Sequence, residues 1–341
     1  MSDVLLLSLG TTLGWRASDA LFLGQLEEAG VSAEAASVRI GASGRLRRAY
    51  PVTDLVEALA ARRALRGALR ERRPRAVVIS STTAAMLADT EGLPYAVRLD
   101  APARLNRPGL HNAPLHALER RALSRARLVL PWSRAAALSL PWQAAPAIVV
   151  PPPVSRSGEL PARRERLAVA YTPDVKAKGL DVVCRAWAEA GIADARLEVF
   201  GVEREAALGH LRRHRIGEPP GVEFRGKRPP EEFRAALRRA HAYVGGARWE
   251  DFGMAPLEAL ADGALLVTVP SKGPFEALAL ARELDPQLVA EPLAPAIRRA
   301  FGLPADQARG YRERAATLVE RFRPEAVQGV VSEELVPALL G

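Results

Sequence analysis

Several residue types are scarce in this 341-residue chain, and each shortage removes a class of protein. The single cysteine, Cys184, excludes a disulfide framework and a cysteine-ligated metal site, so we expect a reducing cytoplasm as its location. No apolar run approaches the length of a transmembrane helix, and the opening MSDVLLLSLG lacks the basic start and cleavage pattern of a signal peptide. No Ser/His/Asp order, zinc-binding spacing or nucleophile motif is recognisable.

Lysine is also scarce, so arginine supplies almost all of the positive charge behind the formal net charge of +9. Such a charge suggests an anionic partner: a nucleotide diphosphate, an acidic lipid surface or nucleic acid. A GC-rich coding bias explains the same arginine content equally well. Nucleic acid is the weakest of these partners, because the arginines are dispersed rather than interleaved with aromatic residues.

The first part of the chain reads as a βαβ unit. An apolar run at residues 4–9, a glycine-containing loop, a helical pattern at residues 17–29 and a second strand near residues 33–39 predict parallel strands. Further strands are expected at residues 75–81, 95–100 and 128–132. The loop is not GxGxxG, and no acidic residue stands where a dinucleotide ribose would need one, which disfavours a dehydrogenase.

Three consecutive prolines at residues 151–153 mark the clearest boundary in the chain. After a polar, arginine-rich run the alternation of strand and helix restarts at residue 167. We therefore expect one domain over residues 1–152 and a second over residues 153–322. A C-terminal helix over residues 323–341 is expected to cross back to the first domain.

The stretch RWEDFGMAPLEALADG at residues 248–263 carries the strongest functional pattern. It places Glu250 and Glu258 on either side of a Phe252-Gly253 turn that leads into a helix, where Pro256 suits the first turn. Outward-facing backbone N–H groups at such a helix start form an anion site. The groups expected there are those of Gly253, Met254, Ala255 and Leu257. The two carboxylates would accept hydrogen bonds from hydroxyls on both sides of a bound phosphate, as in a sugar joined through phosphate to a ribose.

The same stretch resembles the E-x7-E signature of retaining GT-B glycosyltransferases, in particular the large family 4 group. The resemblance rests on the aromatic-glycine pair after the first glutamate, the LEALA sequence around the second, and the glycine and β-run that follow. It implies an α/β GT-B fold, in which two Rossmann-like domains with doubly wound parallel sheets face each other across a cleft. It also implies that Glu258 holds the ribose hydroxyls and Glu250 the hexose hydroxyls. The alternative is an ordinary amphipathic helix with a solvated Glu258.

The tetrapeptide KGLD at residues 178–181 resembles the family's KG-x-D element, whose lysine contacts the donor diphosphate. A cation is needed there because departure of a nucleoside diphosphate builds up negative charge. The family usually adds an arginine six positions earlier, where this chain has Thr172, and Lys176 or Arg16 would have to substitute for it. The alternative for Lys178 is a surface lysine at a helix start.

Two further segments match the donor side of the family. Gly226 and Lys227 correspond to the turn that flanks the base in relatives. The loop SKGPFE at residues 271–276 resembles a glycine-rich loop whose N–H groups complete a phosphate cradle, although Glu276 could equally cap its own helix.

In the first domain, Gly10, Gly14 and Arg16 match the loop where donor diphosphate and acceptor meet in this family, with turn chemistry alone as the alternative. The histidine that usually faces the reacting sugar is replaced by Asp100. An aspartate can bond a sugar hydroxyl, but it cannot present an imidazole.

Residues 53–73 predict a long helix with leucines at helical spacing and arginines over the rest of its surface. Arg45, Arg47 and Arg48 add to this basic zone. Peripheral membrane glycosyltransferases often carry such a helix, and its basic face would bind anionic lipid. A solvated charged face explains the same residues and is slightly favoured, because large aromatic residues are missing.

Together these features predict a cytoplasmic, metal-independent, retaining hexosyltransferase that needs no cofactor. It would move a hexose from a UDP- or GDP-linked donor to an acceptor hydroxyl on a glycan, a lipid or a small molecule. Glu250, Lys178 and Asp100 are the candidate catalytic residues, and the departing phosphate oxygen is the expected base. A catalytically silent nucleotide-sugar-binding subunit is the alternative, followed by a GT-B sugar-nucleotide epimerase.

Overall fold

Two parallel β-sheets with buried central strands form the cores of this protein. The computed structural model describes residues 2–10, 13–38 and 52–341, and the chain divides into two units. The first unit comprises residues 1–153 and 324–341, and the second comprises residues 154–323. The observed boundary lies one residue after the expected one.

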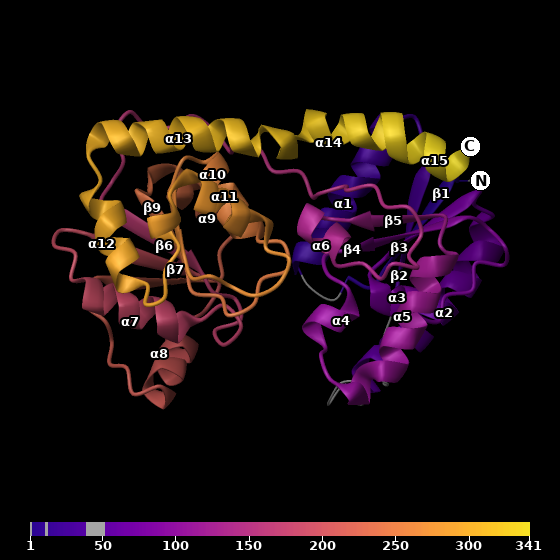
Figure 1. Cartoon of the computed structure of the whole chain (residues 1–341), viewed down its shortest axis with the longest axis horizontal. Coiled ribbons are helices and arrows are strands. Elements are labelled where there is room, and N and C mark those ends of the chain that lie inside the picture. The colour runs from indigo at the N-terminus through magenta and orange to yellow at the C-terminus, as the bar shows by residue number, and fades with distance from the viewer. Residues whose placement is uncertain (1, 11–12, 39–51) are drawn as a thin grey trace. The chain divides into compact units, whose positions relative to one another are not determined.

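The first unit is built on a parallel five-stranded sheet with the order β2-β1-β3-β4-β5 (Figure 1). The strands are β1 (Val4–Ser8), β2 (Ala33–Ser37), β3 (Ala76–Ser80), β4 (Tyr95–Leu99) and β5 (Leu128–Pro131). The helices are α1 (Leu13–Glu28), α2 (Val52–Arg72), α3 (Thr82–Ala85), α4 (Ala103–Asn106), α5 (Ala113–Arg125), α6 (Arg134–Leu138), α14 (Pro324–Val330) and α15 (Val336–Leu340), the last two joined by a π-helical turn (Val331–Leu335).

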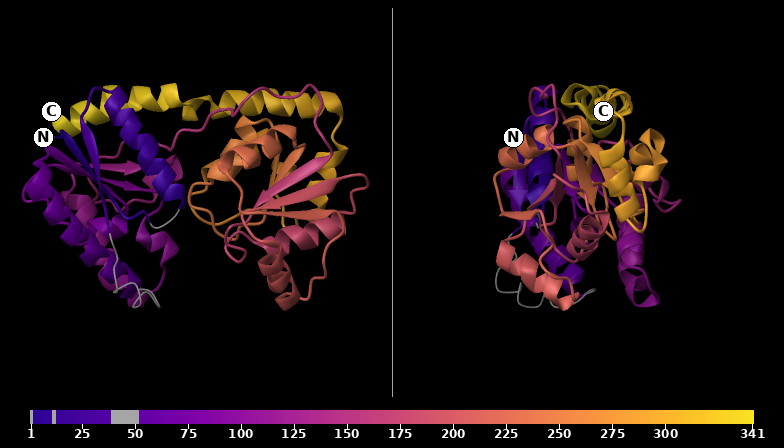
Figure 2. Two further views of the ribbon diagram at one scale, coloured as in Figure 1. Left: turned by 180° about the vertical axis from the view of Figure 1, so that it is seen from behind. Right: turned by 90° about the vertical axis from the view of Figure 1, so that its left-hand side faces the viewer.

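Alternation along the strands divides the core of the first unit into two layers. Leu5 and Leu7 of β1 pack with α2, α3 and α5 on one face of the sheet. Val4 and Leu6 pack with α1 on the other face, where residues 327–339 of the C-terminal helices join the same cluster. The last residues of the chain therefore complete the core of the first unit, beside the N-terminal strand (Figure 2).

The second unit has a parallel sheet with the order β10-β9-β6-β7-β8. Its strands are β6 (Leu167–Tyr171), β7 (Arg196–Phe200), β8 (Val222–Gly226), β9 (Ala242–Gly245) and β10 (Leu265–Thr268). Its helices are α7 (Leu180–Ala190), α8 (Arg204–Arg213), α9 (Pro230–Arg239), α10 (Met254–Ala261), α11 (Glu276–Leu284), α12 (Ala294–Gly302) and α13 (Ala305–Val319). α7 packs with α8 and α12, while α10 packs with α9 and α13 (Figure 1).

Strand order in the second unit identifies where a ligand can bind. The chain leaves β6 toward β7 and returns on the opposite side to form β9, so β6 and β9 flank a topological switch point. In open parallel sheets, ligands bind at the carboxyl ends of the strands at such a point. The predicted α/β, doubly wound architecture is confirmed in both units.

Some local predictions differ from the structure. α1 begins at Leu13 rather than at residue 17, so Gly14 and Arg16 lie in a helix and not in a loop. Arg45, Arg47 and Arg48 lie outside the described residues. In the described ranges, no helix combines the length and apolar character needed to cross a membrane.

Candidate functional site

A small pocket occupies the switch point of the second unit. Thr172 directly follows β6, and Gly246 directly follows β9, so both stand at the carboxyl ends of adjacent strands. We call this the donor pocket; it is lined by Tyr171, Thr172, Lys178, Tyr243, Val244, Gly245, Gly246, Ala247, Glu250, Pro256, Thr268 and Phe275. Strand topology and sequence motif thus indicate the same place.

Close backbone packing brings the Lys178 loop to the donor pocket. Gly179 has a φ of +63°, and a Cβ at this position would lie 1.9 Å from the carbonyl oxygen of Gly246. Only glycine fits such an approach, because the contacting atom is backbone and cannot move aside. The contact fixes the residue before it, Lys178, at the carboxyl end of β9.

Lys178 and Glu250 form an ion pair in the donor pocket. Lys178 Nζ donates to Glu250 Oε1 at 2.8 Å and to Oε2 at 2.7 Å. Burial raises the pKa of Glu250, while the Lys178 ammonium acts in the opposite direction. The residues predicted to bind the diphosphate and the hexose therefore bind each other in this structure.

Backbone hydrogen bonds join the glycine-rich loop at residues 271–276 to the segment that carries Glu250. Glu250 N donates to Lys272 O at 2.9 Å, and Lys272 N donates to Arg248 O at 3.3 Å. Glu276, for which helix capping was the alternative, instead accepts a hydrogen bond from Arg321 at 2.7 Å. The loop thus holds the first glutamate of the motif by backbone pairing.

The start of α10 presents backbone N–H groups without a side-chain cap. Gly253 is the N-cap residue, with a left-handed φ of +86°, and no side chain caps this helix end. A Cβ on Gly253 would lie 2.3 Å from the ring of Phe275. The expectation that the Leu257 N–H is free was wrong, because it donates to Gly253 O and closes the first turn. The predicted anion site therefore loses the Leu257 N–H and keeps those of Gly253, Met254 and Ala255.

Glu258 lies one turn into α10 and has a basic neighbour that sequence analysis missed. Arg234 of α9 approaches Glu258 Oε1 at 3.4 Å, while its Nε donates to the fully buried Asp262 at 2.6 Å. Arg234 also donates to Ser155 O at 2.6 Å. Burial raises the pKa of Glu258, and Arg234 counteracts that effect. No local sequence signal marks Arg234, since it is one of three arginines in α9.

Several other predicted donor residues lie apart from the donor pocket lining. Lys176 is exposed, and its backbone N–H donates to Asp174. Gly226 ends β8 with a φ of +73°, and Lys227 N donates to Glu203 at 2.9 Å. The Lys227 residue is exposed, as expected for a turn read through its backbone.

Thr172 occupies the place of the family's arginine and is almost fully buried, with 1% of its surface exposed. Within the described part of the chain, its hydroxyl has no hydrogen-bond partner. A buried hydroxyl without a partner costs free energy. Thr172 therefore lines the donor pocket with a hydroxyl group that is available to a ligand.

In the first unit, the candidate residues follow the first and fourth strands. Gly10 lies just after β1, and the Arg16 side chain of α1 packs over it: a Cβ on Gly10 would lie 3.3 Å from Arg16 Cγ. Asp100 follows β4, and its Oδ1 accepts a hydrogen bond from the N–H of Ala101 at 2.7 Å. Asp100 and Arg16 both belong to the first unit, and their predicted roles in catalysis and donor binding stay predictions.

Beneath these residues lies a buried ion pair. Arg98 of β4 donates to Asp19 of α1 at 2.6 Å and to Ser18 at 2.9 Å, and Ser8 and Ser80 donate to the same aspartate. Burial lowers the pKa of Arg98 to about 10, although Asp19 opposes the shift. The switch point of the first sheet is therefore filled by protein groups.

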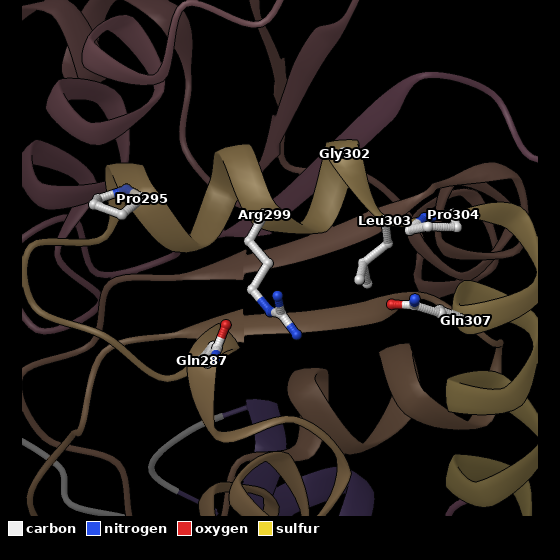
Figure 3. Close-up of a pocket in the computed structure, with 7 residues that line it drawn as sticks. All are labelled: Gln287, Pro295, Arg299, Gly302, Leu303, Pro304 and Gln307. Carbon is white, nitrogen blue, oxygen red and sulfur yellow. The ribbon is translucent and has the colours of Figure 1, made fainter.

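A second cavity of the second unit, of about 400 Å³, contains none of the predicted site residues. It lies between α12 and the start of α13, with Arg299, Gln287 and Gln307 pointing toward it (Figure 3). Arg299 is already paired with Asp285 at 2.9 Å. This cavity gives no support for donor binding.

Comparison with known proteins agrees with this geometry. Residues 166–300 match the family model of glycosyl transferases group 1. No match was found among curated proteins.

Solved structures resemble the chain over its whole length. A UDP-forming α,α-trehalose-phosphate synthase from Burkholderia xenovorans has 12% identity and a TM-score of 0.72, covering 99% of each chain. Sucrose-phosphate synthase from Thermosynechococcus elongatus has 17% identity and a TM-score of 0.69, covering 99% of this chain and 100% of that one. An E. coli trehalose-6-phosphate structure with bound UDP-2-fluoro glucose has 12% identity and a TM-score of 0.71, covering 97% and 98%. The predicted resemblance is confirmed: the chain has the GT-B glycosyltransferase fold, and residues 166–300 of its second unit resemble glycosyl transferases group 1.

Proposed function

We propose that this protein is a retaining glycosyltransferase that moves a hexose from a nucleotide-diphosphate sugar to an acceptor hydroxyl. One observation carries the proposal: the uncapped N-terminus of α10, Lys178 and two partly buried glutamates all lie in segments that follow the switch-point strands β6 and β9. These groups match the charges and hydroxyls of a nucleotide sugar. The positive charge that the leaving group needs comes from the chain itself, so the proposed reaction uses no metal and no cofactor.

The diphosphate is placed at the start of α10 and near Lys178. Backbone N–H groups and the helix dipole favour an anion at this end. Lys178 must break its ion pair with Glu250 before it can contact the diphosphate. Its net contribution to the free energy of donor binding is therefore small. Its gain is larger as the leaving group becomes more negative, which makes Lys178 chiefly a transition-state residue.

The ribose is placed against Glu258. Arg234, held in place by Asp262 and Ser155, keeps a positive charge beside this partly buried carboxylate. An ionised glutamate accepts hydrogen bonds from two vicinal hydroxyls, whereas a protonated one accepts fewer. We therefore assign Arg234 as a positioning residue for Glu258.

The hexose is placed against Glu250. Once Lys178 has moved, the freed carboxylate accepts hydrogen bonds from hexose hydroxyls. Neither glutamate is proposed as a nucleophile. The bond from the anomeric carbon to the phosphate oxygen breaks, and the acceptor oxygen forms the new bond on the same face. The acceptor proton passes to the departing phosphate oxygen, so charge and atoms balance.

A thermal-shift screen over UDP-, GDP-, ADP- and TDP-sugars tests donor binding, since a ligand that binds the native state raises the melting temperature. The preferred donor is then incubated with the purified chain, and release of the nucleoside diphosphate is followed. We expect one base to dominate and Glu250→Gln to abolish release. Absence of any shift with all four donor classes would contradict the proposal.

A catalytically silent nucleotide-sugar-binding subunit is the alternative, favoured by Thr172 and Asp100 in place of the usual arginine and histidine. Donor binding without hydrolysis or transfer by the wild-type chain would support it. An epimerase would instead release a free epimeric nucleotide sugar without any acceptor.

The acceptor is proposed to be a sugar phosphate or a lipid-linked sugar. The first follows from a structural neighbour from Burkholderia xenovorans that is described with glucose-6-phosphate. The second follows from α2, whose exposed face carries Val52, Leu55 and Leu59 and then Arg63, Arg66 and Arg70, at helical spacing. Apolar residues followed by arginines suit the surface of an anionic membrane.

Vesicle sedimentation distinguishes these acceptor classes. If α2 binds lipid, the chain sediments with vesicles that contain phosphatidylglycerol but not with neutral vesicles. Leu55→Ser with Leu59→Ser is then expected to abolish sedimentation while leaving donor binding unchanged. Equal recovery in the supernatant with both kinds of vesicle would favour a soluble sugar phosphate.

A further inference from the structure

A cluster of two imidazoles and one carboxylate lies on the second unit, outside the donor pocket. Asp181 stands in the first turn of α7, and His210 and His214 stand one turn apart at the end of α8. His210 Nε2 lies 3.3 Å from Asp181 Oδ1, and His214 Nδ1 lies 3.7 Å from Asp181 Oδ2. Ligand atoms of all three residues lie within 4.8 Å of one another.

The 3.3 Å between His210 Nε2 and Asp181 Oδ1 matches the separation of two ligands around one transition-metal ion, and the 3.7 Å between His214 Nδ1 and Asp181 Oδ2 is close to it. Two ligands that lie 2.0–2.1 Å from a tetrahedral zinc are about 3.3 Å apart. Histidines four residues apart on a helix present their rings on the same side, and imidazole with carboxylate is a donor set that suits zinc and cobalt. We propose that Asp181, His210 and His214 form a binding site for a divalent transition-metal ion such as zinc.

Hydrogen bonding alone does not account for the cluster. The separation of 3.7 Å between His214 Nδ1 and Asp181 is too long for a hydrogen bond. The Asp181 carboxylate already receives Arg248 Nη2 at 2.7 Å and Nη1 at 3.3 Å. Hydrogen bonds to Asp181 therefore account for the places of Arg248 and His210 but not for that of His214.

Access from solvent permits metal binding. Asp181 itself is nearly buried, with 7% of its side chain exposed, whereas two of the side chains beside it are open to water. Arg248 approaches Oδ2 most closely and can remain there, because ligating carboxylates are commonly hydrogen-bonded by an outer partner. The Arg248 and His214 side chains are 54% and 41% exposed, so a metal ion and a water ligand can enter from solvent.

The three ligands are not among the residues that we assign to the donor. Metal binding therefore does not depend on the proposed glycosyl transfer and is measured without it. The site lies close in the chain to the proposed donor residues, since Asp181 comes three residues after Lys178 and its partner Arg248 two residues before Glu250.

Zinc titration of the full chain, free of any histidine tag, tests the proposal. Binding is followed by competition with a chromophoric chelator, and cobalt is used to record the visible bands of a four-coordinate ion. The wild-type chain is expected to bind one zinc ion per chain. His214→Ala removes an exposed ligand without opening the core and is expected to weaken binding by about tenfold or more and to abolish the cobalt bands.

His111→Ala is the matched control, because His111 is an exposed histidine of the first unit. It is expected to bind zinc as the wild type does. His210→Gln, which keeps a polar side chain at the buried position, should also weaken binding, with circular dichroism used to confirm its fold. Equal zinc affinity in wild type and His214→Ala, or no zinc uptake by the wild type at about 1 mM, would overturn the proposal.

Discussion

Neutralising Glu250 should strengthen the binding of a nucleoside diphosphate while stopping transfer. In the structure, Glu250 holds Lys178 through two contacts of 2.7 and 2.8 Å. A diphosphate that binds at the start of α10 must compete with this carboxylate for the lysine, and it is also repelled by the carboxylate's charge. In Glu250→Gln both effects are weakened, because the amide has nearly the same shape without the charge.

The expected size of the effect follows from the exposure of the pair. Side-chain exposure is 29% for Lys178 and 12% for Glu250, so the pair is partly screened by water. Unit charges about 4 Å apart at an effective dielectric constant of about 20 attract by about 4 kcal/mol, and desolvation offsets much of that energy. A net competition of about 1 to 2 kcal/mol remains, which corresponds to a diphosphate affinity about 5 to 30 times higher in the variant.

Isothermal titration with the nucleoside diphosphate of the preferred base measures this effect. Glu165→Gln is the matched control, because Glu165 is also a paired glutamate of the second unit, bound to Arg196 and Arg239. It should bind the nucleoside diphosphate like the wild type. Turnover of the nucleotide sugar by Glu250→Gln should fall by about a hundredfold or more, since a contact to the reacting hexose is lost. Weaker diphosphate binding in Glu250→Gln would refute the competition.

Three further changes test other parts of the donor pocket. Gly253→Ala forces a Cβ to within 2.3 Å of the Phe275 ring at a φ of +86°, so urea unfolding should show a loss of about 2 to 4 kcal/mol; an unchanged midpoint would contradict this packing. Thr172→Val removes a buried hydroxyl that has no hydrogen-bond partner in the described residues. Its free energy of unfolding should rise by about 1 kcal/mol while titration shows weaker donor binding, and a lower melting temperature without ligand would argue against it. The raised pKa of Glu258 means that nucleotide affinity should fall with decreasing pH already above the ordinary glutamate value of about 4.3, because the carboxylate must be ionised to accept both hydroxyls; titration at several pH values should show this component lost in Glu258→Gln.

Sequence patterns predicted the fold well because buried parallel strands are continuous apolar runs. The runs at residues 4–9 and 167–171 correspond to β1 and β6, and residues 248–263 place the second glutamate inside a helix, as observed. The start of α1 was less well predicted, because Gly14 favours a turn locally although it lies in the helix. Tertiary packing of the helix on the sheet outweighs that preference.

Contacts between side chains that are distant in the sequence could not be predicted from sequence patterns. Lys178 and Glu250 are 72 residues apart, and Arg234 and Glu258 are 24 apart, so no local pattern connects them. The imidazole-carboxylate cluster was also missed, because His210 lies 29 residues from Asp181 and a pair of histidines four apart is a weak signal alone. Each of these pairings joins segments, mostly helices, that only the packed fold brings together.

Two ion pairs, one in the donor pocket and one in the neighbouring α9 and α10 helices, determine the charge that a donor meets. Lys178 and Arg234 are each paired with one glutamate, so the charges of these four residues cancel. A diphosphate adds negative charge, which a freed Lys178 and the α10 N-terminus would balance. Freeing Lys178 leaves the buried Glu250 without its cation, which is costly unless hydroxyls replace it. A nucleotide sugar supplies both the phosphate and the hydroxyls, whereas a nucleoside diphosphate supplies only the first. The ion pair therefore makes the wild-type protein favour the intact donor over its product, and this preference should be smaller once Glu250 is neutral.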